Sequence, residues 1–260
     1  MILTSKDSAW DFKENPPHVA ILPLACLEPH GTHLPVGTDQ FIVTEIAQQA
    51  AELLSFQTFL LPTWPLGLSM QHTGQAGTFS LGFETLWAVV RDIVLALHEH
   101  DIHHVAIINN HGSPTTSTAR PIGNFIVKTA VRQLNYETPG LTAIWVQPFS
   151  AGREALKELF SSADQDIHAG AIETSILMHL TPVLVGPLPH DHAPEFRSVW
   201  MDNTHSFPIA PDEIWGKPGE STAEKGKQAL DAVVNATVEY IEHSFTQLDQ
   251  IKGSLSNDRT

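Results

Sequence analysis

The sequence lacks several features on which whole classes of protein depend. Cys26 is its only cysteine, so an internal disulfide bond is excluded. Only 14 Lys and Arg stand against 29 Asp and Glu, and the net charge of −15 argues against nucleic acid or an anionic membrane as a partner. No apolar run approaches the ~20 residues of a membrane span, and residues 1–17 lack the cationic start and apolar core of a signal peptide. We therefore expect a cytoplasmic protein.

Strands and helices alternate along the predicted structure. Apolar residues make up 42% of the 260 residues, enough for a sizeable core. Apolar runs predict strands at 19–24, 58–62, 105–108 and 141–146, with a possible short strand at 78–81. Helices are predicted at about 39–53, 84–100, 152–160, 168–180 and 219–245, with another that begins near Ser113 and kinks or ends its first part at Pro121. This order predicts one α/β domain over residues 1–260, with a mostly parallel sheet and helices on both faces.

Three stretches do not fit this alternation. Residues 1–17 are polar and predict an arm or an edge segment. Residues 183–210 have no clear period, so the sequence predicts no element there, and the segment Pro189–His192 within it is interpreted as surface. The tail from Ile251 onward is expected to fray.

The loop after the first predicted strand holds two imidazoles and two carboxylates between Glu28 and Asp39. Glu28 and His30 are two residues apart, so on extended chain their side chains point the same way. Such donors suit Zn²⁺ or Mn²⁺. The alternative is a solvated loop in which Asp39 caps the next helix, because a carboxylate at a helix N-terminus is stabilised without a metal.

Three more candidates lie past strands or at helix starts, where ligands bind in parallel sheets. His111 follows the strand at 105–108 in a Gly-containing turn, and is either a ligand or a hydrogen-bonded turn residue. His168 and Glu173 are five residues apart and do not closely share a helix face. They approach one site if His168 precedes the first turn, and are otherwise an N-terminal charge pair.

Weaker candidates are His72 and the hydroxyl of Thr78, which follow the second predicted strand. Cys26 has apolar neighbours, so we interpret it as a small buried hydrophobic residue. The sequence contains no Gly-x-Ser-x-Gly elbow, no phosphate-binding Gly-x-x-x-x-Gly-Lys and no His-Glu-x-x-His.

Taken together, these motifs resemble the creatininase (creatinine amidohydrolase) family. The matching segments in chain order are Leu22–Leu24, Glu28–Pro35, Thr38–Asp39, Gly67–His72, Gly77–Thr78, Asn109–Gly112, His168–Ser175, Gly216–Gly219 and Ala223–Gly226. The resemblance implies a three-layer α/β/α sandwich, a hexamer, and two divalent metal ions per subunit, of Zn, Mn or Fe.

The resemblance also implies roles for single residues. Glu28 and His111 would bind one metal and His30 the other, with Asp39 bridging the two. His168 matches the catalytic histidine of the family, and Glu173 matches an acidic position beside the centre.

The chain departs from creatininase at two places. Creatininase has Tyr-Glu directly after the histidine that matches His111, and that Glu binds the second metal. Here Gly112 and Ser113 follow, so we expect Glu173 to complete the second site. The loop 164–166 also lacks the tryptophan of creatininase, so Trp145, with Thr78 and His72, is the expected substrate contact, and creatinine is not the expected substrate.

These features predict hydrolysis of a non-peptide C–N amide bond, in a cyclic amide or a formamide, by a metal-bound hydroxide. The expected partner is a small-molecule amide substrate. His168 would protonate the leaving nitrogen, and Glu173 would complete the second metal site or accept the proton of the water. One alternative is a peptidase that acts on a short modified peptide. The other is a non-catalytic metal-binding protein that lost activity through Ser113.

Overall fold

The computed structural model describes residues 1–111, 122–195, 200 and 203–257. Five strands form one sheet in the order β1-β3-β2-β4-β5, and each neighbouring pair is parallel. The strands are β1 Ile2–Leu3, β2 Val19–Leu24, β3 Thr58–Leu60, β4 His104–Asn109 and β5 Thr142–Val146. The mostly parallel sheet that the sequence predicts is confirmed. Residues 1–17 supply an edge strand, as expected.

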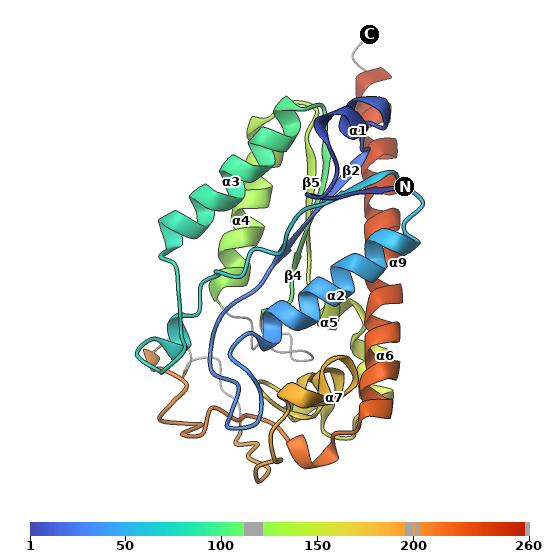
Figure 1. The fold of residues 1–260 in the computed structure, drawn as a ribbon. Coiled ribbons are helices and arrows are strands. Elements are labelled where there is room, and N and C mark those ends of the chain that lie inside the picture. The colour runs from blue at the N-terminus through green and yellow to red at the C-terminus, as the bar shows by residue number, and fades with distance from the viewer. Residues whose placement is uncertain (112–121, 196–199, 201–202, 258–260) are drawn as a thin grey trace.

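Helices cover both faces of the sheet. Figure 1 shows α3 (Phe83–Glu99) and α4 (Ile122–Glu137) on one face, with α2 (Thr38–Leu53) and α9 (Ala223–Asn257) on the other. The shorter helices are α1 Ala9–Glu14, α5 Pro148–Ala151, α6 Arg153–Leu159 and α7 Ala171–Leu180. Single 3₁₀ turns occur at Met70–His72, Ala163–Gln165, Pro182–Leu184 and Pro218–Glu220.

The alternation of side chains along the strands separates the two cores. On β2, Leu22 and Leu24 pack into the cluster under α3 and α4. Val19 and Ile21 pack into the cluster under α2 and α9. Every residue of β2 is buried, as the continuous apolar run predicts for a strand covered on both faces. The predicted α/β/α arrangement is therefore confirmed.

The structure differs from the sequence prediction at both chain ends. Helix α1 was not predicted, although Ser8 and Asp11 form a capping box at its start. The tail does not fray at Ile251, because α9 continues to Asn257. There the ammonium group of Lys252 donates to the carbonyl oxygen of Leu141 and to the hydroxyl of Thr142, at 2.6 and 2.7 Å, which ties the helix to the start of β5.

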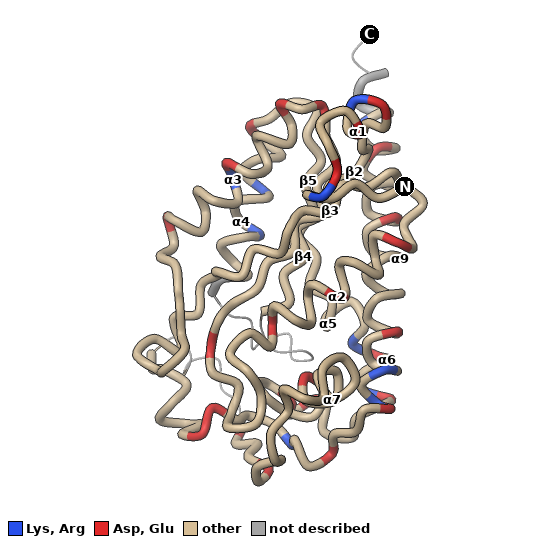
Figure 2. The backbone as a smooth tube through the Cα atoms, in the orientation of Figure 1, with Lys and Arg blue, Asp and Glu red and all other residues tan. Residues whose placement is uncertain are grey.

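Residues 78–81 do not form a strand, since Phe79 makes only a single bridge with Leu27. The expected helix start at Ser113 and the kink at Pro121 lie outside the described residues. Among the helices that the structure describes, none has the length and apolar character needed to span a bilayer. Figure 2 shows acidic residues spread along α3 and α9, with few basic residues among them.

Candidate metal centre

The register of the sheet brings the first two candidate ligands together. Leu24 at the end of β2 pairs with Asn109 at the end of β4, so the loops that follow leave the same edge of the sheet. Glu28 lies in one loop and His111 in the other. The Oε1 atom of Glu28 lies 3.3 Å from Nδ1 of His111, and both side chains are almost fully buried. The predicted pairing of Glu28 with His111 is present in the structure.

Asp39 connects this pair to His30. Its Oδ2 atom lies 3.2 Å from Nδ1 of His111, and its Oδ1 atom lies 3.6 Å from Nε2 of His30. Asp39 is not the N-cap of α2, because Gly37 takes that place without a side-chain cap. The carboxylate is thus turned inward from the first turn of the helix, between the two imidazoles, where the predicted bridging ligand would have to be.

Glu173 reaches the far side of His30. Its Oε2 atom lies 3.8 Å from Nε2 of His30 and accepts a hydrogen bond of 2.8 Å from the backbone N–H of Ala169. Ala169 has a φ of +51°, which is uncommon for a residue other than glycine. This backbone turn just before α7 lets His168 and Glu173 approach the same site, although α7 itself begins only at Ala171. The helix predicted from His168 thus begins three residues later, and His168 precedes the first turn, which is the condition under which it and Glu173 approach one site.

The donors form groups that suit a divalent ion. In one group, the ligand atoms of Cys26, Glu28, Asp39 and His111 all lie within 4.8 Å of one another. In a second group, the ligand atoms of His30, His168 and Glu173 also lie within 4.8 Å of one another. Nε2 of His30 is buried and has no hydrogen-bond partner, an arrangement that is costly unless a cation fills the space. Imidazole nitrogens and carboxylate oxygens match the preferences of Zn²⁺ and Mn²⁺.

The pKa values of the buried groups show how strongly they depend on each other. Burial disfavours the charged form of Glu28, but the charges of His111, His72 and His168 and a hydrogen bond with His111 together outweigh burial and hold the pKa of Glu28 well below its usual value. Burial also disfavours the imidazolium form of His30, but Asp39 and Glu173 raise the pKa of His30 to about 9. The raised pKa of His30 shows the negative potential of the buried carboxylates, and the same potential attracts a metal cation, which binds an imidazole nitrogen in place of its proton.

His168 belongs to the second group, and the hydrogen bond of its ring goes to the backbone and not to a carboxylate. Its Nε2 atom donates a hydrogen bond of 2.7 Å to the carbonyl oxygen of Pro29, and its Nδ1 atom lies 3.7 Å from Oε1 of Glu28. Burial, reinforced by the charge of His30, holds the pKa of His168 well below its usual value. The side chain is 13% exposed, more than the carboxylates that surround it. His168 is therefore a neutral base at the edge of the centre.

Two amide side chains hold the backbone of His111 by hydrogen bonds. Asn109 accepts a hydrogen bond of 3.2 Å from the backbone N–H of His111, and Asn124 of α4 donates one of 2.8 Å to its carbonyl oxygen. The two amides also bond to each other at 2.7 Å. Asn109 and Asn124 thus hold the backbone that carries the candidate ligand His111.

The surroundings of Cys26 differ from the sequence interpretation. It is buried, as expected, but its sulfur lies among the ligand atoms of Glu28, Asp39 and His111 instead of in an apolar core. Burial raises the pKa of its thiol to about 11. Its position two residues before Glu28 on extended chain could have revealed this, because alternate side chains share a face.

His72 is held by partners that the sequence did not indicate. Its Nε2 atom lies 3.6 Å from Oε1 of Glu28, while its Nδ1 atom donates to Glu213 at 2.8 Å. Ser206 donates to the same oxygen of Glu213 at 2.9 Å. Glu213 has a φ of +52° and is 141 residues away from His72, so no local pattern points to it. His72, Glu28 and His168 form a third group of possible ligand atoms.

Glu213 is expected to tune this centre through His72. In a Glu213→Gln variant the charged partner of the His72 ring is lost, and His72 lies 3.6 Å from the candidate ligand Glu28, so we expect metal affinity to fall about 10-fold, the size of effect that groups supporting a metal ligand have. Titration with a competing chelator measures the affinity. Glu154→Gln on the exposed side of α6 is the matched control. An unchanged affinity in the Glu213 variant would contradict this role.

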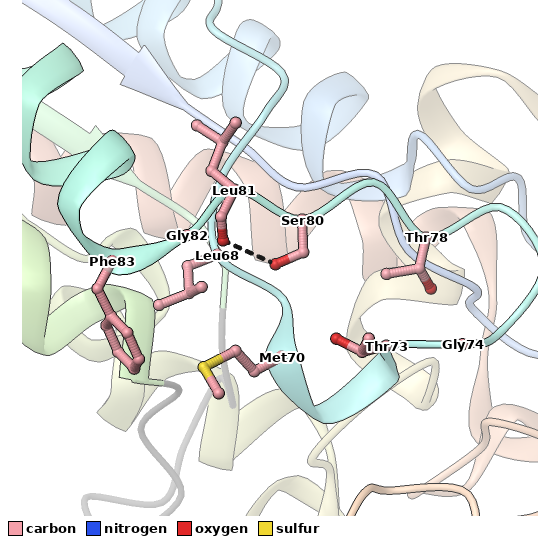
Figure 3. Close-up of a pocket in the computed structure, with 9 residues that line it drawn as sticks. All are labelled: Leu68, Met70, Thr73, Gly74, Thr78, Ser80, Leu81, Gly82 and Phe83. Atoms are coloured by element: carbon pink, nitrogen blue, oxygen red, sulfur yellow. Dashed lines mark hydrogen bonds between the residues drawn. The ribbon is translucent and has the colours of Figure 1, made fainter.

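The other two expected substrate contacts have different surroundings. The hydroxyl of Thr78 donates to the carbonyl oxygen of His72 at 2.9 Å, so Thr78 shapes the loop that carries His72. It also lines an open cavity of about 480 Å³ with Leu68, Met70, Thr73, Gly74, Ser80, Leu81, Gly82 and Phe83 (Figure 3). Trp145 of β5 packs on the core under α3 and α4, with the ammonium of Lys128 5.6 Å from its ring centre. Contact of these residues with a substrate stays a prediction.

Comparison with known proteins gives one family match. The model of the family described as creatininase, creatinine amidohydrolase, matches residues 4–241. A mycofactocin precursor peptide peptidase of Mycobacterium ulcerans is 28% identical over 235 residues, which cover 85% of this chain and 83% of the relative. A creatinine amidohydrolase of Pseudomonas putida is 26% identical over 243 residues, which cover 87% and 90%.

Solved structures agree with the fold. A manganese form of creatininase superposes with a TM-score of 0.76 at 19% identity, covering 94% of this chain and 99% of the other. A Zn–Zn form of a creatininase mutant superposes with a TM-score of 0.73 at 18% identity, covering 94% and 99%. At these identities the likeness shows the shared architecture.

Proposed function

The chain belongs to the creatininase family of hydrolases, and from that premise we propose that it uses divalent metal ions to cleave a C–N amide bond. One observation carries the proposal. Asp39 lies between the pair Glu28–His111 on one side and the pair His30–Glu173 on the other. A carboxylate shared by two sets of donors is what a two-metal hydrolase needs.

Each residue has a defined place in this proposal. Glu28 and His111 would hold the first ion, His30 and Glu173 would hold the second, and Asp39 would be shared between them. Glu173 takes the place that the second-metal glutamate of creatininase would fill, since Ser113 is a poor ligand. Bound ions supply a water of lowered pKa and polarise the amide carbonyl.

The proton path runs through His168. Its Nε2–H is committed to the carbonyl oxygen of Pro29, so its Nδ1 atom carries the lone pair and faces Glu28. In this position Nδ1 accepts the proton that the attacking water loses and later delivers it to the leaving nitrogen. The backbone N–H of Ala169 donates to Glu173 and fixes its carboxylate beside His30, which supports the role of a ligand for Glu173.

We propose a small non-peptide amide, either a cyclic amide or a formamide, as the substrate. The site supports a small substrate because its carboxylates and imidazoles are buried, with only His168 partly open. A peptidase that acts on a short modified peptide is the second candidate. It is favoured by the likeness to mycofactocin precursor peptide peptidases. The predicted hexamer and cytoplasmic location stay predictions.

A substrate panel with defined metal content tests the proposal. Purified protein is stripped with a chelator, reloaded with Zn²⁺ or Mn²⁺, and assayed on cyclic amides, formamides and short peptides. We expect two ions per chain, turnover on one substrate class, loss of turnover on stripping and recovery on reloading. Turnover on peptides alone would favour the second candidate. One ion per chain with no turnover on any class would favour a non-catalytic metal-binding protein.

A further inference from the structure

We propose that Cys26 binds the first metal ion through its sulfur, and that this position therefore prefers Zn²⁺ over Mn²⁺. The inference rests on the proposed function, because it assumes that Glu28, Asp39 and His111 hold an ion. It adds a fourth donor of a different kind to that set. The ligand atoms of these four buried residues all lie within 4.8 Å of one another.

The chain geometry directs the sulfur inward. Cys26 and Glu28 are alternate residues that follow β2, so their side chains share one side of the chain. Gly67 packs against the sulfur, because a Cβ atom at that position would lie 2.5 Å from Sγ of Cys26, so only glycine leaves room for the thiol there. The thiol is 1% exposed and is packed against backbone on that side. It therefore stays beside the ligands and cannot turn to solvent.

The donor chemistry then determines which ion fits. A thiolate, an imidazole and two carboxylates form a mixed set of sulfur, nitrogen and oxygen that suits Zn²⁺ or Co²⁺. Mn²⁺ prefers oxygen and imidazole donors without sulfur. On binding, the S–H bond breaks, the proton leaves to solvent and the sulfur–metal bond forms, so no oxidant or reductant is needed. The second position, with His30 and Glu173, has no sulfur donor within its group.

Cobalt spectroscopy on the full-length protein tests the inference directly. Stripped protein is titrated with Co²⁺ in a thiol-free reductant. We expect visible d–d bands from bound cobalt and, in addition, a near-ultraviolet sulfur-to-cobalt charge-transfer band. The Cys26→Ser variant should keep the d–d bands and lose the charge-transfer band. Cys26→Ala serves as a second variant, and circular dichroism verifies that both variants fold.

A competition experiment adds a second readout. With equal Zn²⁺ and Mn²⁺, the ratio of bound zinc to manganese should fall about 10-fold or more from the wild type to Cys26→Ser. Bound cobalt without a charge-transfer band in the wild type would overturn the role of Cys26 while leaving the metal centre intact. An absence of cobalt binding would overturn the metal centre and this inference together.

Discussion

Replacing Asp39 with Asn is expected to abolish measurable hydrolysis and to remove at least one metal ion per chain. Both carboxylate oxygens are engaged, one toward His111 at 3.2 Å and the other toward His30 at 3.6 Å. An amide offers one neutral oxygen and an NH₂ donor, so it cannot contact two cations. Losing a shared ligand costs several kcal/mol of transition-state stabilisation, which corresponds to about 10³-fold in turnover.

Elemental analysis after gel filtration and turnover on the substrate identified in the panel measure the effect. The matched control is Asp92→Asn, which removes an exposed carboxylate from α3. It should keep both ions and full turnover. Asn still suits the first turn of α2, so the variant is expected to fold, and circular dichroism checks this. If Asp39→Asn kept two ions and wild-type turnover, the bridging role would be wrong.

The sequence predicted those parts of the molecule that depend on short stretches of chain. The continuous apolar run predicts β2 with its observed bounds, because a strand buried on both faces needs an apolar side chain at every position. Glu28, His30 and Asp39 lie within one loop and the helix that follows, so their closeness depends on local geometry alone. The parallel topology then places His111 at the same edge of the sheet.

The residues that the sequence did not reveal depend on contacts between distant segments. Glu213 reaches His72 from a segment without periodicity, through a backbone conformation that its residue type rarely adopts. Cys26 has apolar neighbours, and its spacing of two residues from Glu28 is a weak local sign of a position that depends on His111, a residue of another strand end. Helix α9 extends further than expected because Lys252 finds carbonyl and hydroxyl partners around β5, which a helical pattern does not encode.

A second variant, His168→Ala, tests whether His168 transfers the proton. His168→Ala is expected to lower turnover by ~10²–10⁴-fold, the usual contribution of general acid–base catalysis, while both metal ions remain bound. The reason is that His168 is bonded to the backbone of Pro29 and not to a carboxylate, so its loss leaves Glu28, Asp39 and Glu173 in place. The exposed His179→Ala on α7 is the control and should behave as wild type.

Metal content separates this role from its rival. His168 also belongs to two groups of possible ligand atoms, so it could hold an ion instead of moving a proton. If it is a ligand, His168→Ala loses an ion and turnover falls equally for all substrates. If it is the acid, both ions stay, added imidazole restores part of the rate, and the loss shrinks for amides with a less basic leaving nitrogen. Such leaving groups depart with less help from a proton, so a graded loss across a substrate series would assign the proton transfer to His168.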